Sequence, residues 1–126
     1  LIDDPRIRTV EHIKRLIIEL VHHQDNRLRT NLSQYLAMEC RHDYGTLSKL
    51  FSETQGTTIE KYFIAQKIER AKELLDYGEL TLNEIADRLN YSSTAHLSAQ
   101  FKAQTGYTPR QYRQQKERAR IPLDKI

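Results

Sequence analysis

Two stretches of the chain place small polar side chains and a single lysine on the outward face of a predicted helix. In the first stretch, Leu47 and Phe51 recur four residues apart and mark the inward face. Because each helical residue turns by ~100°, the opposite face can be read directly from the sequence. That face carries Gly45, Lys49 and Ser52, with Ser48 beside them.

The second stretch repeats this arrangement. Leu97 and Phe101 mark its inward face. The outward face carries Ala95, Ala99 and Lys102, flanked by Thr94 and Ser98. Side chains of these types suit recognition better than catalysis. Serine and threonine hydroxyls bond to base edges or phosphates, alanine touches a thymine methyl, and lysine reaches guanine or a phosphate.

Three hydroxyl residues at predicted helix starts complete the candidate set, because helix N-termini present free N–H donors to phosphates. The residues predicted to contact DNA are Tyr44, Gly45, Ser48, Lys49, Ser52, Ser92, Ser93, Thr94, Ala95, Ser98, Lys102 and Thr108. For each serine and threonine, an ordinary solvated surface remains an alternative reading.

Catalytic and metal-binding motifs are missing from the sequence. It contains no Gly-rich phosphate loop, no GxSxG, no HExxH and no cluster of carboxylates on a common helical face. His22 and His23 are adjacent and point to different sides of a helix, and their spacing to Cys40 and His42 fits no zinc pattern. We therefore expect neither an enzyme nor a cofactor or metal site.

The amino-acid composition limits the classes of protein to which the chain can belong. The chain has 126 residues, 38% of them hydrophobic, and no apolar run approaches the ~20 residues that span a bilayer. The single cysteine and the lack of a signal peptide predict a cytoplasmic protein with no membrane partner. Net charge is +3, but residues 81–126 carry eight Lys and Arg against four Asp and Glu. That asymmetry favours phosphate contacts in the C-terminal third, although a solvated basic tail after Arg113 would look the same.

Residues 81–113 read as helix, tight turn, helix and docking helix. Leu82, Ile85, Ala86 and Leu89 predict the first helix, and Asn90 suits the left-handed turn that follows. Ser92 is the predicted N-cap of the second helix, and Gly106 is its predicted end. Thr108 and Pro109 then start a helix that carries Tyr112. A helix-turn-helix unit or a plain helical hairpin fits this pattern.

An earlier segment has the same order. Asp4 and Pro5 predict the start of a helix that runs to His23, and a polar loop follows over Asp25–Thr30. Asn31 and Asp43 are the predicted caps of two further helices, which are separated by a turn at Arg41 and His42 and closed near Gly56.

The two segments are copies of one unit. Leu47, Phe51, Gly56 and Tyr62 recur as Leu97, Phe101, Gly106 and Tyr112, each shifted by 50 residues, while Leu36 and Ala37 recur as Ile85 and Ala86, shifted by 49. One residue is therefore inserted in the second turn region. Between the copies, residues 58–77 form a predicted helix of ~30 Å. Such a helix could hold two reading helices about one DNA turn apart. Its apolar positions are too broad for a strict coiled-coil seam.

The doubled unit, the helix with KIERAKELL, the segment LTLNEIADRLNYSSTAHLSAQFK and the ending TGYTPRQYR resemble the DNA-binding domain of the AraC/XylS family of bacterial transcription regulators. The resemblance covers about residues 31–113. It implies an all-α fold of about seven helices, with two helix-turn-helix subdomains joined by a long linker helix, and two recognition helices that enter successive major grooves. It also implies double-stranded DNA as partner, RNA polymerase as a further candidate partner, and an effector-binding or dimerising segment that we expect upstream of Leu1.

Some residues depart from the family pattern. Asn90 and Tyr91 stand where Gly and Phe are usual, Arg41 and His42 replace Gly in the first turn, and Ala99 occupies a position that often holds a base-reading Arg. The expected organisation is an N-terminal helix and loop (1–30), a first helix-turn-helix (31–57), a linker helix (58–78), a second helix-turn-helix with its docking helix (79–118) and a tail (119–126). The expected function is a sequence-specific DNA-binding domain of a transcription regulator, and the alternative is a helical protein-interaction module that keeps the fold without binding DNA.

Overall fold

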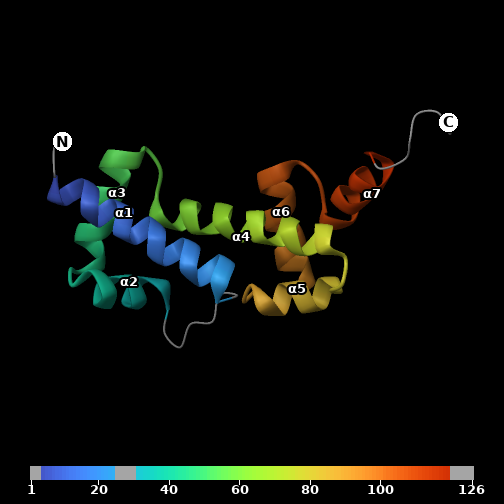
Figure 1. Cartoon of the computed structure of the whole chain (residues 1–126), viewed down its shortest axis with the longest axis horizontal. Helices are drawn as coiled ribbons and strands as arrows, with labels where there is room; N and C mark the ends of the chain where they lie inside the picture. The colour runs from blue at the N-terminus through green and yellow to red at the C-terminus, as the bar shows by residue number, and fades with distance from the viewer. Residues whose placement is uncertain (1–3, 25–30, 120–126) are drawn as a thin grey trace. The chain divides into compact units, whose positions relative to one another are not determined.

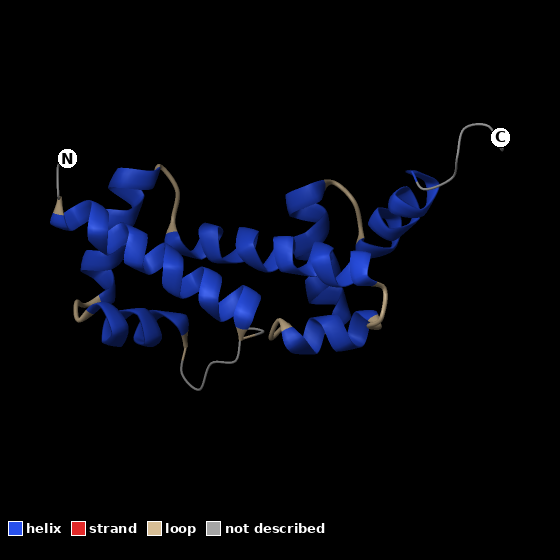
Figure 2. Ribbon diagram, viewed as in Figure 1, coloured by secondary structure: helices blue, strands red, loops and turns tan. Residues whose placement is uncertain are grey.

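The computed structural model describes residues 4–24 and 31–119, and every regular element in that part of the chain is helical (Figure 1, Figure 2). The elements are α1 (Pro5–Ile18), the π-helical segment η1 (Glu19–His23), α2 (Leu32–Cys40), α3 (Tyr44–Gln55), α4 (Ile59–Tyr77), α5 (Leu82–Arg88), α6 (Thr94–Thr105) and α7 (Pro109–Ala119). The predicted all-α fold of about seven helices is confirmed. The predicted loop at Asp25–Thr30 and residues 120–126 of the predicted tail lie outside the described residues.

The chain divides into two compact units, residues 1–67 and 68–126, with the boundary inside α4. In the first unit, α1, α2 and α3 contact one another (Figure 1). Its buried core combines side chains from these helices and the start of α4: Val10, Ile13, Ile17, Val21, Leu36, Leu47, Phe51 and Ile59. Ile7 has the same helical spacing as Val10 and Ile13, but it lies in the first turn of α1 and is 54% exposed.

The first helix reaches His23 as predicted, but its last turn is a π-helix. The Gln24 N–H bonds to the Glu19 carbonyl at 3.1 Å, five residues back. Both Leu20 and Val21 are fully buried in this wider turn, and His22 Nε2 lies 2.9 Å from Gln66 Oε1 of α4. Hydrophobic spacing alone could not reveal this widening.

In the second unit, α6 contacts both α5 and α7 (Figure 1). Ile85, Ala86 and Leu89 are buried in the α5 region, as predicted, and Leu97 and Phe101 are buried in α6. The second half of α4 contributes four further buried side chains to this unit, Ile68, Ala71, Leu74 and Leu75.

The predicted repeat is confirmed at the level of individual contacts. The rings of Phe51 and Tyr62 lie edge to face with centroids 5.6 Å apart, and those of Phe101 and Tyr112 do the same at 5.5 Å. After α2, the His42 N–H bonds to the Ala37 carbonyl at 3.3 Å, and after α5, the Tyr91 N–H bonds to the Ala86 carbonyl at 2.9 Å. Each unit therefore closes its first helix with the same type of bond.

The two turns differ by one residue, as the spacing predicted. Each turn contains one non-glycine residue in the left-handed region of backbone conformation. Arg41 has φ 57°, and Asn90 has φ 60°. The next helix is capped two residues after Arg41, by Asp43, but three residues after Asn90, by Ser93. The prediction that Ser92 caps α6 was therefore wrong, because the extra residue moves the extended cap conformation one position along the chain.

Candidate nucleic-acid interface

The start of α3 is fixed by Asp43. Its Oδ2 accepts a hydrogen bond from the Thr46 N–H at 3.0 Å, and its Oδ1 accepts one from Thr46 Oγ1 at 2.7 Å. These bonds hold the pKa of the Asp43 carboxyl below its usual range. Gly45 leaves room for the cap, because a Cβ at this position would lie 3.2 Å from Asp43 Oδ2. The first turn of α3 is thus rigidly held at the predicted position.

The outward face of α3 agrees with the sequence pattern. Leu47 and Phe51 are fully buried, while Gly45 and Lys49 are exposed. Ser48 and Ser52 are half-buried at the edges of this face. Within residues 4–24 and 31–119, Lys49 makes no ion pair, so its ammonium is available to an external ligand.

Tyr44, the first residue of α3, has a partner that the sequence did not indicate. Its hydroxyl donates a hydrogen bond to Glu60 Oε2 in the first turn of α4. Burial of the phenol, together with the hydrogen bond and the charge of Glu60, raises the pKa of Tyr44. Glu60 lies 16 residues away in sequence, so helical periodicity could not have linked the two.

The start of α6 is built differently but presents a similar surface. Ser93 Oγ accepts from the His96 N–H at 3.1 Å. Ala95 and Lys102 are exposed, and Thr94 and Ser98 are half-buried. Lys102, like Lys49, forms no ion pair with any residue in the described part of the chain. The structure therefore brings Thr94, Ala95, Ser98 and Lys102 onto α6, directly after the Ser92 and Ser93 turn.

His96 was missed by sequence reasoning, although it is exposed in the first turn of α6. Its ring lies edge to face with the buried ring of Tyr91, with centroids 5.0 Å apart. The Tyr91 hydroxyl donates to Gln100 Oε1 at 2.8 Å, and burial raises the pKa of Tyr91 to about 12. Tyr91, which follows Asn90 as His42 follows Arg41, thus connects the second turn to α6 through Gln100 and the ring of His96.

Thr108 lies at the start of α7, where it forms a reciprocal cap with Gln111. Thr108 Oγ1 accepts from the Gln111 N–H at 3.2 Å, and Gln111 Oε1 accepts from the Thr108 N–H at 2.9 Å. The Thr108 amide is therefore already bonded, and only its hydroxyl proton remains for a phosphate.

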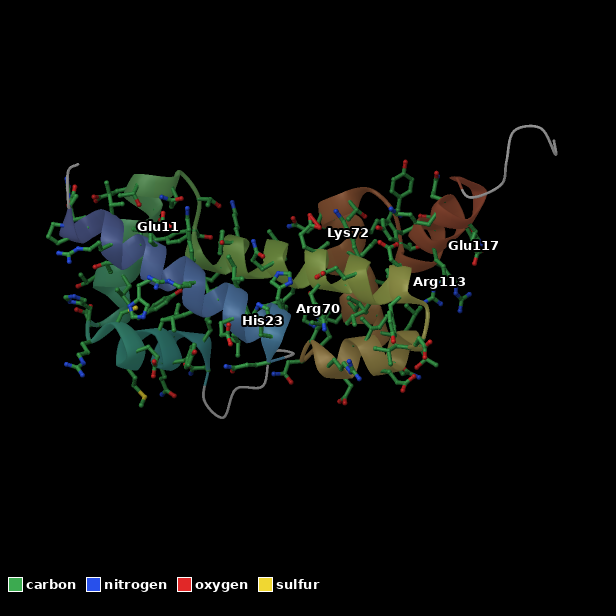
Figure 3. The ribbon with its side chains drawn as sticks, viewed as in Figure 1. Glu11, His23, Arg70, Lys72, Arg113 and Glu117 are labelled. Atoms are coloured by element: carbon green, nitrogen blue, oxygen red, sulfur yellow. The ribbon has the colours of Figure 1, made fainter. Side chains whose placement is uncertain are left out.

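Two arginines of α7 face an open cavity of about 400 Å³ in the second unit, which Thr81, Thr94 and Pro109 also line. They are Arg110 and Arg113, and Arg113, labelled in Figure 3, also donates to the Leu80 carbonyl at 3.4 Å. Neither arginine is among the residues predicted to contact DNA. Their i, i+3 spacing on the docking helix was the available signal.

Other kinds of site are not formed by the described residues. Within residues 4–24 and 31–119, no group of three or more His, Cys, Asp or Glu side chains is placed to hold a metal ion. No helix in the same part of the chain has both the length and the apolar character needed to cross a membrane.

Comparison with known proteins assigns this architecture. Residues 32–115 match the family described as "Helix-turn-helix domain". The chain belongs to this family, in its AraC type. The resemblance proposed from the repeat, the linker helix and the TGYTPRQYR ending is thereby confirmed, and the AraC-type domain identifies a DNA-binding module of transcription regulators.

Relatives and solved structures agree with the AraC-type assignment. An uncharacterized HTH-type transcriptional regulator of Staphylococcus aureus (strain MSSA476) is 38% identical over 96 residues, which are 76% of this chain but 12% of that protein. The C-terminal domain of AraT, a response regulator from Geobacillus stearothermophilus, superposes with a TM-score of 0.73 at 25% identity, covering 98% of this chain and 92% of that one. The DNA-binding domain of AdpA, solved in complex with a target DNA, shares the fold with a TM-score of 0.69 at 22% identity, covering 94% of this chain and 97% of that one.

Proposed function

We propose that this AraC-type domain reads two successive major grooves of double-stranded DNA, with α3 in one groove and α6 in the next. The observation that carries the proposal is the duplicated surface. Each helix begins at a side-chain cap, buries a Leu and a Phe, and turns an unpaired lysine with small polar residues outward. Small residues let a helix sit deep in the groove, where base edges can be read.

The proposal assigns roles to the predicted residues. On α3, Gly45, Ser48, Lys49 and Ser52 would face base edges, and on α6, Thr94, Ala95, Ser98 and Lys102 would do the same. Ser92, Ser93 and Thr108 would bind phosphates. The hydroxyl oxygens of Ser93 and Thr108 accept a backbone N–H, so each hydroxyl keeps its own proton to donate, while the Ser92 hydroxyl lies 3.5 Å from His96 Nδ1. Arg110 and Arg113 would add positive charge beside these phosphate contacts.

The wider setting belongs to the same proposal. The protein would act in the cytoplasm of a bacterium, with RNA polymerase as a candidate protein partner and an effector-binding or dimerising segment elsewhere in the protein. The alternative function, a helical interaction module without DNA affinity, is favoured by the low net charge of +3 and by the alanines at positions 95 and 99 of α6.

Selection from a random or genomic duplex pool, followed by salt titration of the enriched duplex, separates the two functions. We expect two conserved half-sites with centres about 10 base pairs apart. With six to ten phosphate contacts, affinity should fall by ~10³ to 10⁵ between 50 and 200 mM salt. If no sequence were enriched, or if binding did not depend on salt, the interaction module would be the better description.

A further inference from the structure

The phenol of Tyr44 and the carboxylate of Glu60 form a fixed pair at the start of α3. Tyr44 is the first residue of α3, Glu60 is the second residue of α4, and the Tyr44 hydroxyl donates to Glu60 Oε2. The phenol is half-buried, while the carboxylate is exposed. Both residues lie in the same compact unit, so the pair is part of one folded body.

The direction of this hydrogen bond limits what Tyr44 can offer to a ligand. A phenol carries one O–H donor, and an ionised carboxylate only accepts hydrogen bonds. While Glu60 is ionised, the Tyr44 proton is committed to it, and the phenolic oxygen presents only lone pairs to other groups. The remaining lone pairs of Glu60 are acceptors as well, so the pair as a whole accepts and does not donate.

We propose that Tyr44, held by Glu60, is a specificity-determining residue of α3 that accepts a hydrogen bond from the exocyclic amino group of adenine or cytosine. The inference rests on the proposed function. In the major groove, adenine N6 and cytosine N4 are the only hydrogen-bond donors, whereas guanine and thymine present acceptors. Phosphates are also acceptors, so the pair would not bind the DNA backbone. Glu60 acts through Tyr44 and is a positioning residue.

The same helix carries the opposite chemistry further along. Lys49 is exposed, donates only, and suits guanine O6 and N7. The half-site under α3 should therefore contain an amino-bearing base at the position read by Tyr44, together with an acceptor-rich base read by Lys49. Along α3, the first residue therefore offers a hydrogen-bond acceptor, Tyr44, and the middle of the helix offers a donor, Lys49.

Selection from the random duplex pool with wild-type chain, Tyr44→Phe and Glu60→Ala tests the inference. At one position of the first half-site, the wild type should prefer adenine or cytosine. Tyr44→Phe should reduce that preference about two- to tenfold, the effect of one hydrogen bond. Glu60→Ala frees the Tyr44 proton to donate, so guanine and thymine should become accepted at the same position.

Two matched variants control for general effects of the substitutions. Tyr35→Phe removes a half-buried phenol of α2, and Glu39→Ala removes an exposed carboxylate of the same helix. Both should leave the base preference unchanged. A duplex with purine in place of the adenine, or 2-pyrimidinone in place of the cytosine, should weaken wild-type binding by the same factor and leave Tyr44→Phe unaffected.

The outcomes are distinguishable. The inference is overturned if Tyr44→Phe keeps the wild-type preference at every position, or if it weakens all sequences equally. The proposed function itself fails if the wild type enriches no sequence. An unchanged preference in the second half-site reports that a variant is folded. If Tyr44→Phe did not fold, Glu60→Ala would decide. The inference would be refuted if that variant still rejected guanine and thymine at the position read by Tyr44.

Discussion

At the scale of single residues, Lys49 offers the most direct test of α3 as a reading helix. It is exposed and forms no ion pair within the described residues. If Lys49 contacts a base, Lys49→Ala should weaken binding to the selected duplex by about 1–3 kcal/mol. Lys14→Ala removes the same charge from α1, where Lys14 lies 3.8 Å from Glu11, and should have little effect. Fluorescence anisotropy at fixed salt measures both, and unchanged affinity in Lys49→Ala would mean that α3 is misassigned.

Substitutions of Asn90 test the backbone conformation of the second turn. Its φ of 60° lies in the left-handed region, which asparagine and glycine tolerate and β-branched residues do not. We expect Asn90→Gly to change the free energy of unfolding by less than about 0.5 kcal/mol, and Asn90→Val to lower it by about 1–2 kcal/mol. Urea denaturation measures the difference, and equal stabilities of the two variants would contradict the assigned backbone conformation.

Local sequence spacing predicts part of the site, and tertiary packing determines the rest. Leu47, Phe51, Leu97 and Phe101 could be placed inward because their spacing is local, and the exposed lysines followed from the same periodicity. The bond between Tyr44 and Glu60 could not be foreseen, because it depends on how α4 packs against the start of α3. The location of His96 beside Tyr91 likewise depends on a turn whose cap was predicted one residue too early.

At the scale of elements, helix caps link the stability of the fold to pH. The pKa of Asp43 is lowered mainly by its side-chain bond to Thr46, and the pKa of Glu84 is lowered mainly by its bond to the Thr81 backbone. A carboxyl whose folded pKa is depressed stabilises the fold above its unfolded pKa, and this contribution is lost as pH falls through the folded value. We therefore expect stability to decline below about pH 4, where the unfolded carboxyls take up protons.

Asp43→Asn separates titration from capping. Asparagine also caps helices well, but it does not titrate, so this variant should lose less stability than the wild type on going from neutral to acidic pH. Urea unfolding followed by circular dichroism at pH 7 and pH 3 measures how much unfolding free energy the wild type and Asp43→Asn each lose between the two pH values. If the two losses were equal, the acid sensitivity would come from other carboxyls.

The elements themselves were largely predictable, for identifiable reasons. Asp4, Asn31 and Asp43 cap their helices as expected, because a polar residue followed by an apolar helical pattern specifies a start locally. The π-helical turn at Glu19–His23 gave no such signal. Leu20 and Val21 follow Ile13 and Ile17 at ordinary helical spacing, so periodicity accounts for their burial but not for the wider turn.

Across the whole chain, each of the two compact units has its own buried core. The duplication therefore predicts that one unit can unfold while the other stays folded. Phe51 and Phe101 are equivalent in the repeat and are both fully buried. Removing either ring should cost about 3–5 kcal/mol, which is a large share of the stability of so small a unit. In Phe101→Ala, we expect hydrogen exchange to show lost protection in α5, α6 and α7 while α1, α2 and α3 stay protected.

DNA binding by the same variants would show whether the two units bind independently. Counterion release is proportional to the number of phosphates contacted, so a chain with one intact unit should show about half the wild-type slope of log affinity against log salt. The Phe101→Ala chain should bind only the DNA half-site contacted by α3. The Phe51→Ala chain should bind only the half-site contacted by α6. If either substitution abolished exchange protection throughout residues 4–119, the two cores would unfold as one, because the shared helix α4 would then couple them more strongly than each core stabilises its own unit.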